Sequence, residues 1–130
     1  MTDARPQDLL ADFTPPFLYT RETASRAPSA PGVHVVLEHG TVLYVGWTGD
    51  LRRRLHQHLA GNRGSSVLHD QVGQRLDEPG REASADEIAD WLGQREVRWQ
   101  ETDFPQPLRD ALVLALRPPF NRSVPVQPGS

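Results

Sequence analysis

Four side chains between residues 34 and 58 are of the types that bind phosphate and move protons. His34 has an imidazole, Tyr44 has a phenol, and Arg54 and His58 lie four residues apart. An imidazole with a pKa near 6.5 is a better general base at neutral pH than a phenol with a pKa near 10. The guanidinium of Arg54 can bind two phosphate oxygens at once. Together these side chains suit chemistry on a phosphodiester, provided that the fold gathers them.

The segment from residue 32 to residue 46 is predicted to form a β-hairpin. Val33, Val35 and Leu37 alternate with three other side chains, a period of two that is typical of a strand. His39–Gly40 is a tight-turn sequence, and residues 41–46 return as a second strand with the same alternation. Two such runs this close favour antiparallel pairing. Taken alone, His34 would be interpreted as a surface histidine on the first strand.

A helix is predicted directly after the hairpin. Residues 48–50 (Thr-Gly-Asp) supply N-cap chemistry, and leucines recur every four residues at 51, 55 and 59. At about 100° per residue, Arg54 and His58 flank this apolar stripe, whereas Arg53 points away from it. We therefore expect Arg54 and His58 to lie along the seam between the helix and the sheet.

The remaining elements predict an α/β (α+β) domain with a small three-stranded antiparallel sheet flanked by helices. The third strand is predicted at 95–102, beside the hairpin. Helices are predicted at 67–76, at 84–94 with a capping box, and at 108–116, where an apolar surface on nearly all sides indicates a core element. The N-terminal segment is expected to hold one or two helical turns at 6–13, a packing anchor at 17–19 and a loop at 21–31, with a loose tail at 124–130. The predicted organisation is an arm at 1–31, a domain at 32–122 and a tail at 123–130.

Composition indicates a soluble cytoplasmic protein of one domain. The chain has 130 residues, no cysteine, and no apolar run long enough to span a bilayer. Its net charge of −3 argues against indiscriminate binding of nucleic acid. Charge is unevenly placed, however, with a net of +3 over residues 50–63 and −6 over residues 77–103. A local basic face can still bind phosphates, although an Arg-rich solvated helix would give the same pattern.

An ordered set of short motifs resembles the GIY-YIG nuclease domain. These motifs are Gly32-Val33-His34, Tyr44-Val45-Gly46, Thr48, the Arg54-Leu55 and His58 helix, and Arg117-Pro118-Pro119-Phe120-Asn121. The resemblance spans about residues 32 to 121. It implies an endonuclease that hydrolyses DNA phosphodiester bonds with Mg²⁺ or Mn²⁺. It implies His34, Tyr44, Arg54 and His58 as catalytic residues, and we expect nucleic-acid contacts at Thr48, Arg52, Arg63, Ser65 and Asn121. A domain this small also suggests a homodimer or a partner protein.

Two positions depart from the family pattern. His34 stands where the family usually has Tyr, and Arg109 stands where it has the metal-binding Glu, twelve residues before Asn121. A guanidinium has no lone pair for a metal, and Asp110 lies about 100° around the helix. Three explanations stay open: a degenerate domain that binds nucleic acid or another protein without cutting, a guanidinium that replaces the metal, or an inactivated form of an active enzyme.

Overall fold

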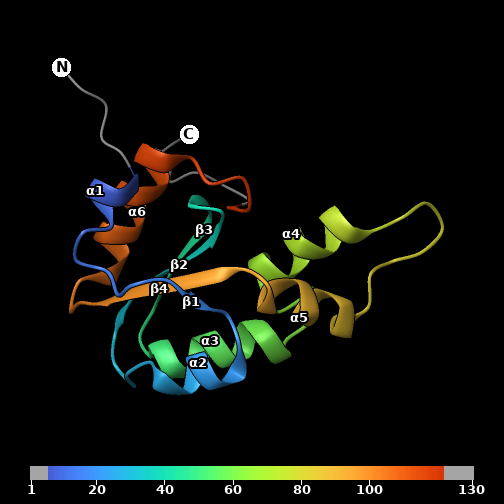
Figure 1. The fold of residues 1–130 in the computed structure, drawn as a ribbon, viewed down its shortest axis with the longest axis horizontal. Coiled ribbons are helices and arrows are strands. Elements are labelled where there is room, and N and C mark those ends of the chain that lie inside the picture. The colour runs from blue at the N-terminus through green and yellow to red at the C-terminus, as the bar shows by residue number, and fades with distance from the viewer. Residues whose placement is uncertain (1–5, 122–130) are drawn as a thin grey trace.

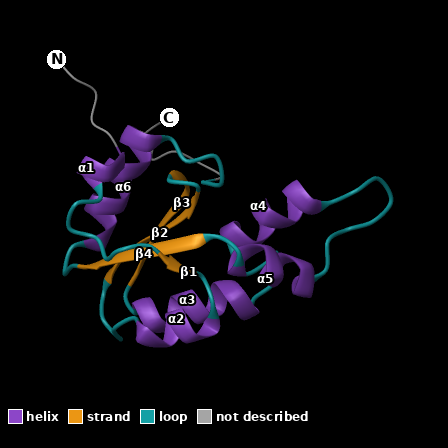
Figure 2. Ribbon diagram, in the orientation of Figure 1, coloured by secondary structure: helices purple, strands orange, loops and turns teal. Residues whose placement is uncertain are grey.

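The computed structural model describes residues 6–121, which form a four-stranded antiparallel sheet with helices on both faces (Figures 1 and 2). The strand order is β1-β4-β2-β3, so β1 and β3 are the edges. The strands are β1 (Phe17–Leu18), β2 (Gly32–Glu38), β3 (Thr41–Thr48) and β4 (Glu96–Glu101). The helices are α1 (Pro6–Leu9), α2 (Arg21–Arg26), α3 (Leu51–Ala60), α4 (Val67–Leu76), α5 (Ala85–Gly93) and α6 (Pro105–Leu116). The predicted tail at 123–130 lies outside the described residues.

The hairpin of β2 and β3 confirms the prediction from the alternating pattern. His39 and Gly40 both have positive φ, 52° and 80°, which matches the twist of the flanking strands. His34 pairs with Gly46 and Val36 pairs with Tyr44. The register then shifts, because Leu37 pairs with Val42 and an extra residue bulges from β3.

The two faces of the sheet support separate apolar cores. One face packs against α2, α3, α4 and α5 and includes Val36, Tyr44 and Leu55. The other packs against α1 and α6 and includes Val35, Val45 and Val113. Because both faces are covered, every residue of β2 from 32 to 37 is buried. Alternate side chains of β2 therefore point into two different cores, rather than one set into a core and the other into solvent.

The N-terminal segment corrects two sequence predictions. β1 pairs with β4 and adds a fourth strand, so the prediction of three strands is one too few. Residues 21–26 form α2 instead of a loop, because the hydroxyl of Thr20 accepts a hydrogen bond from the backbone N–H of Thr23 at 3.2 Å. The expected anchor is confirmed at Tyr19, which is buried and donates from its hydroxyl to the carbonyl of Leu55 at 2.8 Å.

The later helices match the sequence pattern, with one exception in α6. α4 has the predicted bounds, and α5 begins at a capping box between Ser84 and Glu87. α6 begins at Pro105, earlier than expected, and only one stripe of it is buried, at Leu112 and Val113. Leu114 is 45% exposed, so the expectation of a helix buried on nearly all sides is wrong. Among residues 6–121, no helix has the length and apolarity required to cross a membrane.

Candidate functional site

The rings of His34, Tyr44 and His58 form one layer between the sheet and α3. The ring centroids lie 5.1 Å apart for His34 and His58, 5.8 Å for Tyr44 and His58, and 5.9 Å for His34 and Tyr44. His34 and His58 are fully buried, and Tyr44 is 8% exposed. The structure thus brings together three predicted site residues from β2, β3 and α3, and the expected position of His58 at the seam is confirmed.

Gly46 makes room for this layer, and Gly32 makes room for the start of α3. A Cβ atom on Gly46 would lie 2.7 Å from the imidazole of His34 and 2.9 Å from the ring of Tyr44. A Cβ atom on Gly32 would lie 2.5 Å from the carbonyl oxygen of Gln100 and 2.5 Å from the Leu51 side chain, at the start of α3. These glycines are required by close approach of their neighbours rather than by an unusual backbone conformation.

Burial keeps the two imidazoles neutral. Within residues 6–121, neither ring nitrogen of His34 has a hydrogen-bond partner, and His58 uses Nδ1 in a 2.7 Å hydrogen bond with the hydroxyl of Ser66. Loss of hydration lowers the pKa of His34 to about 3, with a smaller contribution from the charge of Arg54. It lowers the pKa of His58 well below its usual value. His34 is therefore not the surface histidine that the strand pattern alone suggests, and solvent does not reach it.

Tyr44 lies at the outer side of the layer, within the field of two guanidinium groups. Burial raises the pKa of the Tyr44 phenol, and the charges of Arg54 and Arg109 oppose that shift. The phenol is therefore protonated at neutral pH and can donate a hydrogen bond to a ligand. Arg54 is half-buried, donates to the Gln57 side chain at 3.3 Å and borders a hollow of about 390 Å³. Arg53 points outward and is exposed, as the helical spacing predicts.

The side chains around Tyr44 do not fit a divalent cation. Arg109 offers no lone pair, and its Nε donates to the neighbouring carboxylate of Asp110 at 2.6 Å. Within residues 6–121, no three His, Asp, Glu or Cys side chains are grouped so that they could hold a metal ion. The Mg²⁺ or Mn²⁺ expected from the resemblance therefore has no ligand set among the described residues.

Most of the predicted nucleic-acid contacts are engaged in local structure. The hydroxyl of Thr48 accepts from the N–H of Asp50 at 3.1 Å at the start of α3. Arg52 donates to the carbonyl of Ala27 at 2.8 Å, and the Ser65 hydroxyl to the carbonyl of Asn62 at 3.2 Å. Arg63 forms ion pairs with Asp70 and Asp77 at 3.0 and 2.9 Å. The structure places none of these four side chains in the ring layer.

Asn121 stabilises the edge of the sheet beside the site. Its side-chain oxygen accepts from the N–H of Val45 at 2.9 Å, and its side-chain nitrogen donates to the carbonyl of Val45 at 2.8 Å. The amide thus replaces a neighbouring strand at the exposed edge of β3. The role of nucleic-acid contact predicted for Asn121 stays a prediction.

Sequence reasoning missed the contact between Ser66 and His58. Its hydroxyl caps α4 by accepting from the N–H of His69 at 3.0 Å, and the same oxygen contacts His58. The capping role could be read from the sequence, because serine precedes an apolar helix pattern. The contact with His58 could not, since it depends on how α3 and α4 pack.

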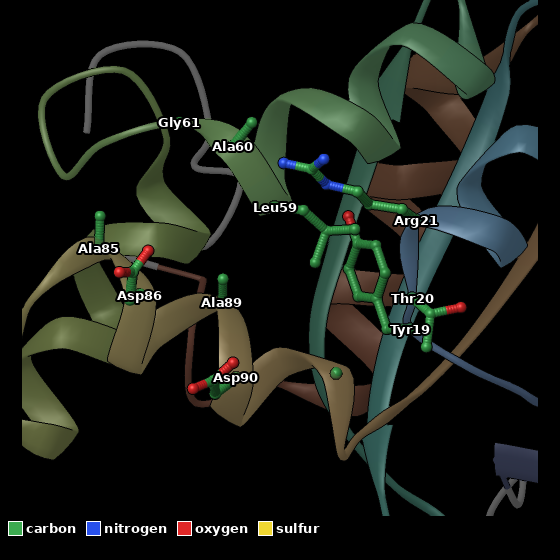
Figure 3. A pocket seen from close by; sticks show the side chains of 11 residues that line it. Tyr19, Thr20, Arg21, Leu59, Ala60, Gly61, Ala85, Asp86, Ala89 and Asp90 are labelled. Carbon is green, nitrogen blue, oxygen red and sulfur yellow. The ribbon is translucent and has the colours of Figure 1, made fainter.

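A second hollow lies away from the ring layer, between α2, α3 and α5 (Figure 3). Its volume is about 310 Å³, and Tyr19, Ala60 and Ala89 contribute to its lining. Arg21 extends over Tyr19 on one side, and Asp86 and Asp90 project from α5 on the other (Figure 3). Two carboxylates in its wall make this hollow unsuited to a polyanion, so we assign the site to the ring layer instead.

Comparison with known proteins defines the fold class. No protein-family model matches the chain, and no curated protein matches it. Among solved structures, this chain is similar to the N-terminal GIY-YIG endonuclease domain of UvrC from Thermotoga maritima. The first structure compared is a point mutant of that domain bound to the catalytic divalent cation. That comparison has 20% identity and a TM-score of 0.51, and it covers 79% of this chain and 94% of that chain. The same domain bound to magnesium gives 20% identity, a TM-score of 0.51, and coverage of 78% and 93%.

These observations define an α+β domain with a four-stranded antiparallel sheet and a histidine–tyrosine layer beneath α3. The particular fold is that of the GIY-YIG nuclease domain. This confirms the resemblance inferred from the short motifs. The sheet has four strands, whereas the sequence pattern predicts three.

Proposed function

We propose that this chain binds the phosphodiester backbone of DNA at a phosphate face formed by Tyr44, Arg54 and Arg109. The observation that supports this proposal is a protonated phenol within the field of two guanidinium groups, whose N–H groups are donors of the same kind. Phosphate oxygens are acceptors only, so this set is complementary to them. The charge of −3 on the whole chain limits nonspecific binding, and the local arginines attract the backbone.

Each member of the phosphate face has a distinct part in this proposal. The Arg54 guanidinium binds two oxygens of one phosphate, and the Tyr44 hydroxyl donates to the same group. Arg109, whose Nε is paired with Asp110 at 2.6 Å, presents its remaining N–H donors where the family has a metal-binding Glu. The neutral rings of His34 and His58 pack beneath Tyr44 and hold the phenol in place without adding charge.

The first test is equilibrium binding of labelled DNA in the presence of EDTA. We expect affinity to fall steeply between about 50 and 200 mM salt, because bound arginines release counterions from the backbone. Arg54→Gln and Arg109→Gln should each weaken binding about tenfold, in the range of charge-assisted hydrogen bonds. Arg53→Gln is the matched control, because Arg53 lies on the same helix and faces solvent. Equal affinity for all variants, or affinity independent of salt, would refute the proposal.

Hydrolysis of the bound phosphodiester is the second candidate function. It is favoured by the position of Tyr44 and His58 in one layer with Arg54 close by, which is the set that the family motif implies. Water would attack phosphorus and give its proton to bulk solvent, and the bond to the leaving sugar oxygen would break. The Tyr44 phenol suits protonation of that oxygen and would recover its proton from solvent. The Arg109 guanidinium would stabilise the charge of the transition state. Of the three explanations for Arg109, this candidate adopts replacement of the metal.

Nicking of plasmid and branched DNA distinguishes the two functions. The reactions contain Mg²⁺, Mn²⁺ or EDTA, and they use this chain, Tyr44→Phe and Arg109→Glu. Cutting that survives EDTA and is lost in Tyr44→Phe would support hydrolysis with Arg109 in place of the metal. Cutting only by Arg109→Glu, and only with metal, would identify a binding domain that lacks one ligand. Binding without cutting by any chain would leave backbone binding as the function.

A further inference from the structure

One large aromatic side chain is exposed on the strand that carries Tyr44. Trp47 is 42% exposed, although the residues before it, from 42 to 46, are buried. β3 is an edge strand, so among residues 6–121 no strand pairs with Trp47 on the side away from β2. An indole left open on a strand whose other apolar side chains are buried suggests a surface with a partner.

The sheet register places Trp47 on the same edge strand as Tyr44, with its side chain on the opposite face of the sheet. Trp47 follows Tyr44 by three residues, about 10 Å along a strand. It pairs with Val33 and shares a sheet face with Val45, the face covered by α6. Arg109 precedes the buried Leu112 and Val113 of α6 by three and four residues, which puts it on the helix stripe turned toward that face. Trp47 and Arg109 therefore lie on the α6 face, whereas Tyr44 and Arg54 lie on the α3 face, and a DNA strand that passes around the β3 edge can contact both.

We infer that Trp47 stacks on an unpaired base of the DNA whose phosphate binds at the phosphate face. This inference rests on the proposed function and adds the substrate class, which is DNA that is single-stranded or locally unpaired. Both faces of a base in a duplex are already covered by its neighbours. An unpaired base has a free π-face, and aromatic side chains beside a basic groove bind such bases with little sequence preference.

Binding of one oligonucleotide as a single strand and as a duplex tests the inference. We expect tighter binding of the single strand, and Trp47→Ala should weaken it about tenfold, which corresponds to about 1.4 kcal/mol of stacking. Duplex binding should change less than twofold. Trp47→Phe should retain most of the affinity, because a phenyl ring still stacks. Leu18→Ala is the matched control, since Leu18 is 58% exposed on β1, at the opposite edge of the sheet.

Tryptophan fluorescence provides an independent readout. Trp99 is 7% exposed and Trp91 stacks against the Arg95 guanidinium at 4.1 Å, so Trp47 is the most accessible of the three indoles. A single strand should quench the emission of the chain, and Trp47→Phe should remove that quenching. Thermal melting of each variant shows whether it has folded.

The outcomes separate this inference from the proposed function. Loss of binding in Arg54→Gln with no effect of Trp47→Ala on either DNA form would refute base stacking and leave backbone binding intact. Equal affinity for single strand and duplex in the unsubstituted chain would also refute it. Failure of every chain to bind any DNA would instead refute the proposed function.

Discussion

Arg54 and Arg63 belong to the same basic stretch of the sequence, yet the structure uses them in opposite ways. Arg54 lies beside Tyr44. Within residues 6–121, its guanidinium forms a hydrogen bond only with the neutral side chain of Gln57. Arg63 is neutralised by Asp70 and Asp77, a set that we call the Arg63 clamp. The clamp ties the loop after α3 to both ends of α4. One arginine is thus available to a ligand, and the other has become part of the fold.

The difference shows that the charge of a segment does not locate a binding surface. The two residues have the same side chain, and the sequence counts both toward a local charge of +3. What distinguishes them is a carboxylate within hydrogen-bond distance. Asp70 and Asp77 come from outside the basic stretch, and α4 carries them to Arg63. The following predictions test this contrast, from the largest expected effect to the smallest.

Acid should destabilise the ring layer before it affects the Arg63 clamp. The unfolded chain protonates His34 below about pH 6.5, whereas the folded chain does so only near pH 3, so the free energy of unfolding should fall as pH drops between these values. The slope is about 1.4 kcal/mol per pH unit, or about 4 kcal/mol over three units, and His58 adds in the same direction. Arg63 lowers the pKa of Asp77, so the clamp is lost only below the usual carboxylate range.

Urea unfolding at pH 5.0, 5.75 and 6.5 measures this slope. His34→Phe keeps a ring but cannot be protonated, so it should flatten the slope whatever its effect on absolute stability. His39→Asn is the control, because His39 is exposed and asparagine tolerates its φ of 52°. A slope that is the same in all three chains would show that His34 is not buried as the structure places it.

Alanine at Gly46 should cost more than alanine at Gly73. Each glycine faces a side chain, since an added Cβ would lie 2.7 Å from the His34 imidazole in one case and 2.7 Å from Arg63 Nε in the other. The imidazole is enclosed in the ring layer and cannot move, so Gly46→Ala should lower the free energy of unfolding by about 1–3 kcal/mol. The Arg63 side chain can shift, and alanine favours a helix interior by about 1 kcal/mol over glycine.

Chemical denaturation of both variants checks this order. Gly49→Ala is a matched control, because no atom lies within 4 Å of the added Cβ. If Gly73→Ala proved the more damaging, the Arg63 clamp would be the more rigid of the two regions.

Asn121 should stabilise the fold rather than bind DNA. Asn121→Ala removes two hydrogen bonds to Val45 and should lower the free energy of unfolding by about 1–2 kcal/mol. Asn121→Asp should be at least as damaging, since it places a carboxylate oxygen opposite the Val45 carbonyl. DNA affinity, measured well below the melting temperature, should not change. A loss of affinity equal to that of Arg54→Gln would instead support the nucleic-acid contact predicted from the sequence.

Arg63→Gln should have the smallest effect and should act on stability alone. It breaks the ion pairs of the clamp, so the melting temperature should fall, and more at low salt than at high salt. DNA affinity should remain within about twofold of that of the unsubstituted chain, in contrast with the tenfold effect expected for Arg54→Gln. Similar losses of affinity in the two variants would remove the distinction between the two arginines.

Much of the fold could be predicted from local sequence. The hairpin was determined by its alternation and by the His39–Gly40 turn, and α5 by its capping box. β1 was missed because two residues carry no periodic signal, and α2 because a six-residue helix is defined mainly by the Thr20 cap. The exposed face of α6 was also missed, since an apolar helix does not show which of its sides will be covered.

The sequence by itself determined the spacing of the candidate site. Arg54 and His58 lie where the helix period turns them toward one seam, because that period is a property of the local backbone. Only the tertiary structure decided the hydration, hydrogen bonding and charge pairing of these side chains. The packing of α3 and α4 over the sheet removed water from two imidazoles, gave His58 its contact with Ser66 and placed carboxylates beside Arg63 but not beside Arg54. Hydration and charge pairing depend on which segments meet in space, and no spacing along the chain contains that information.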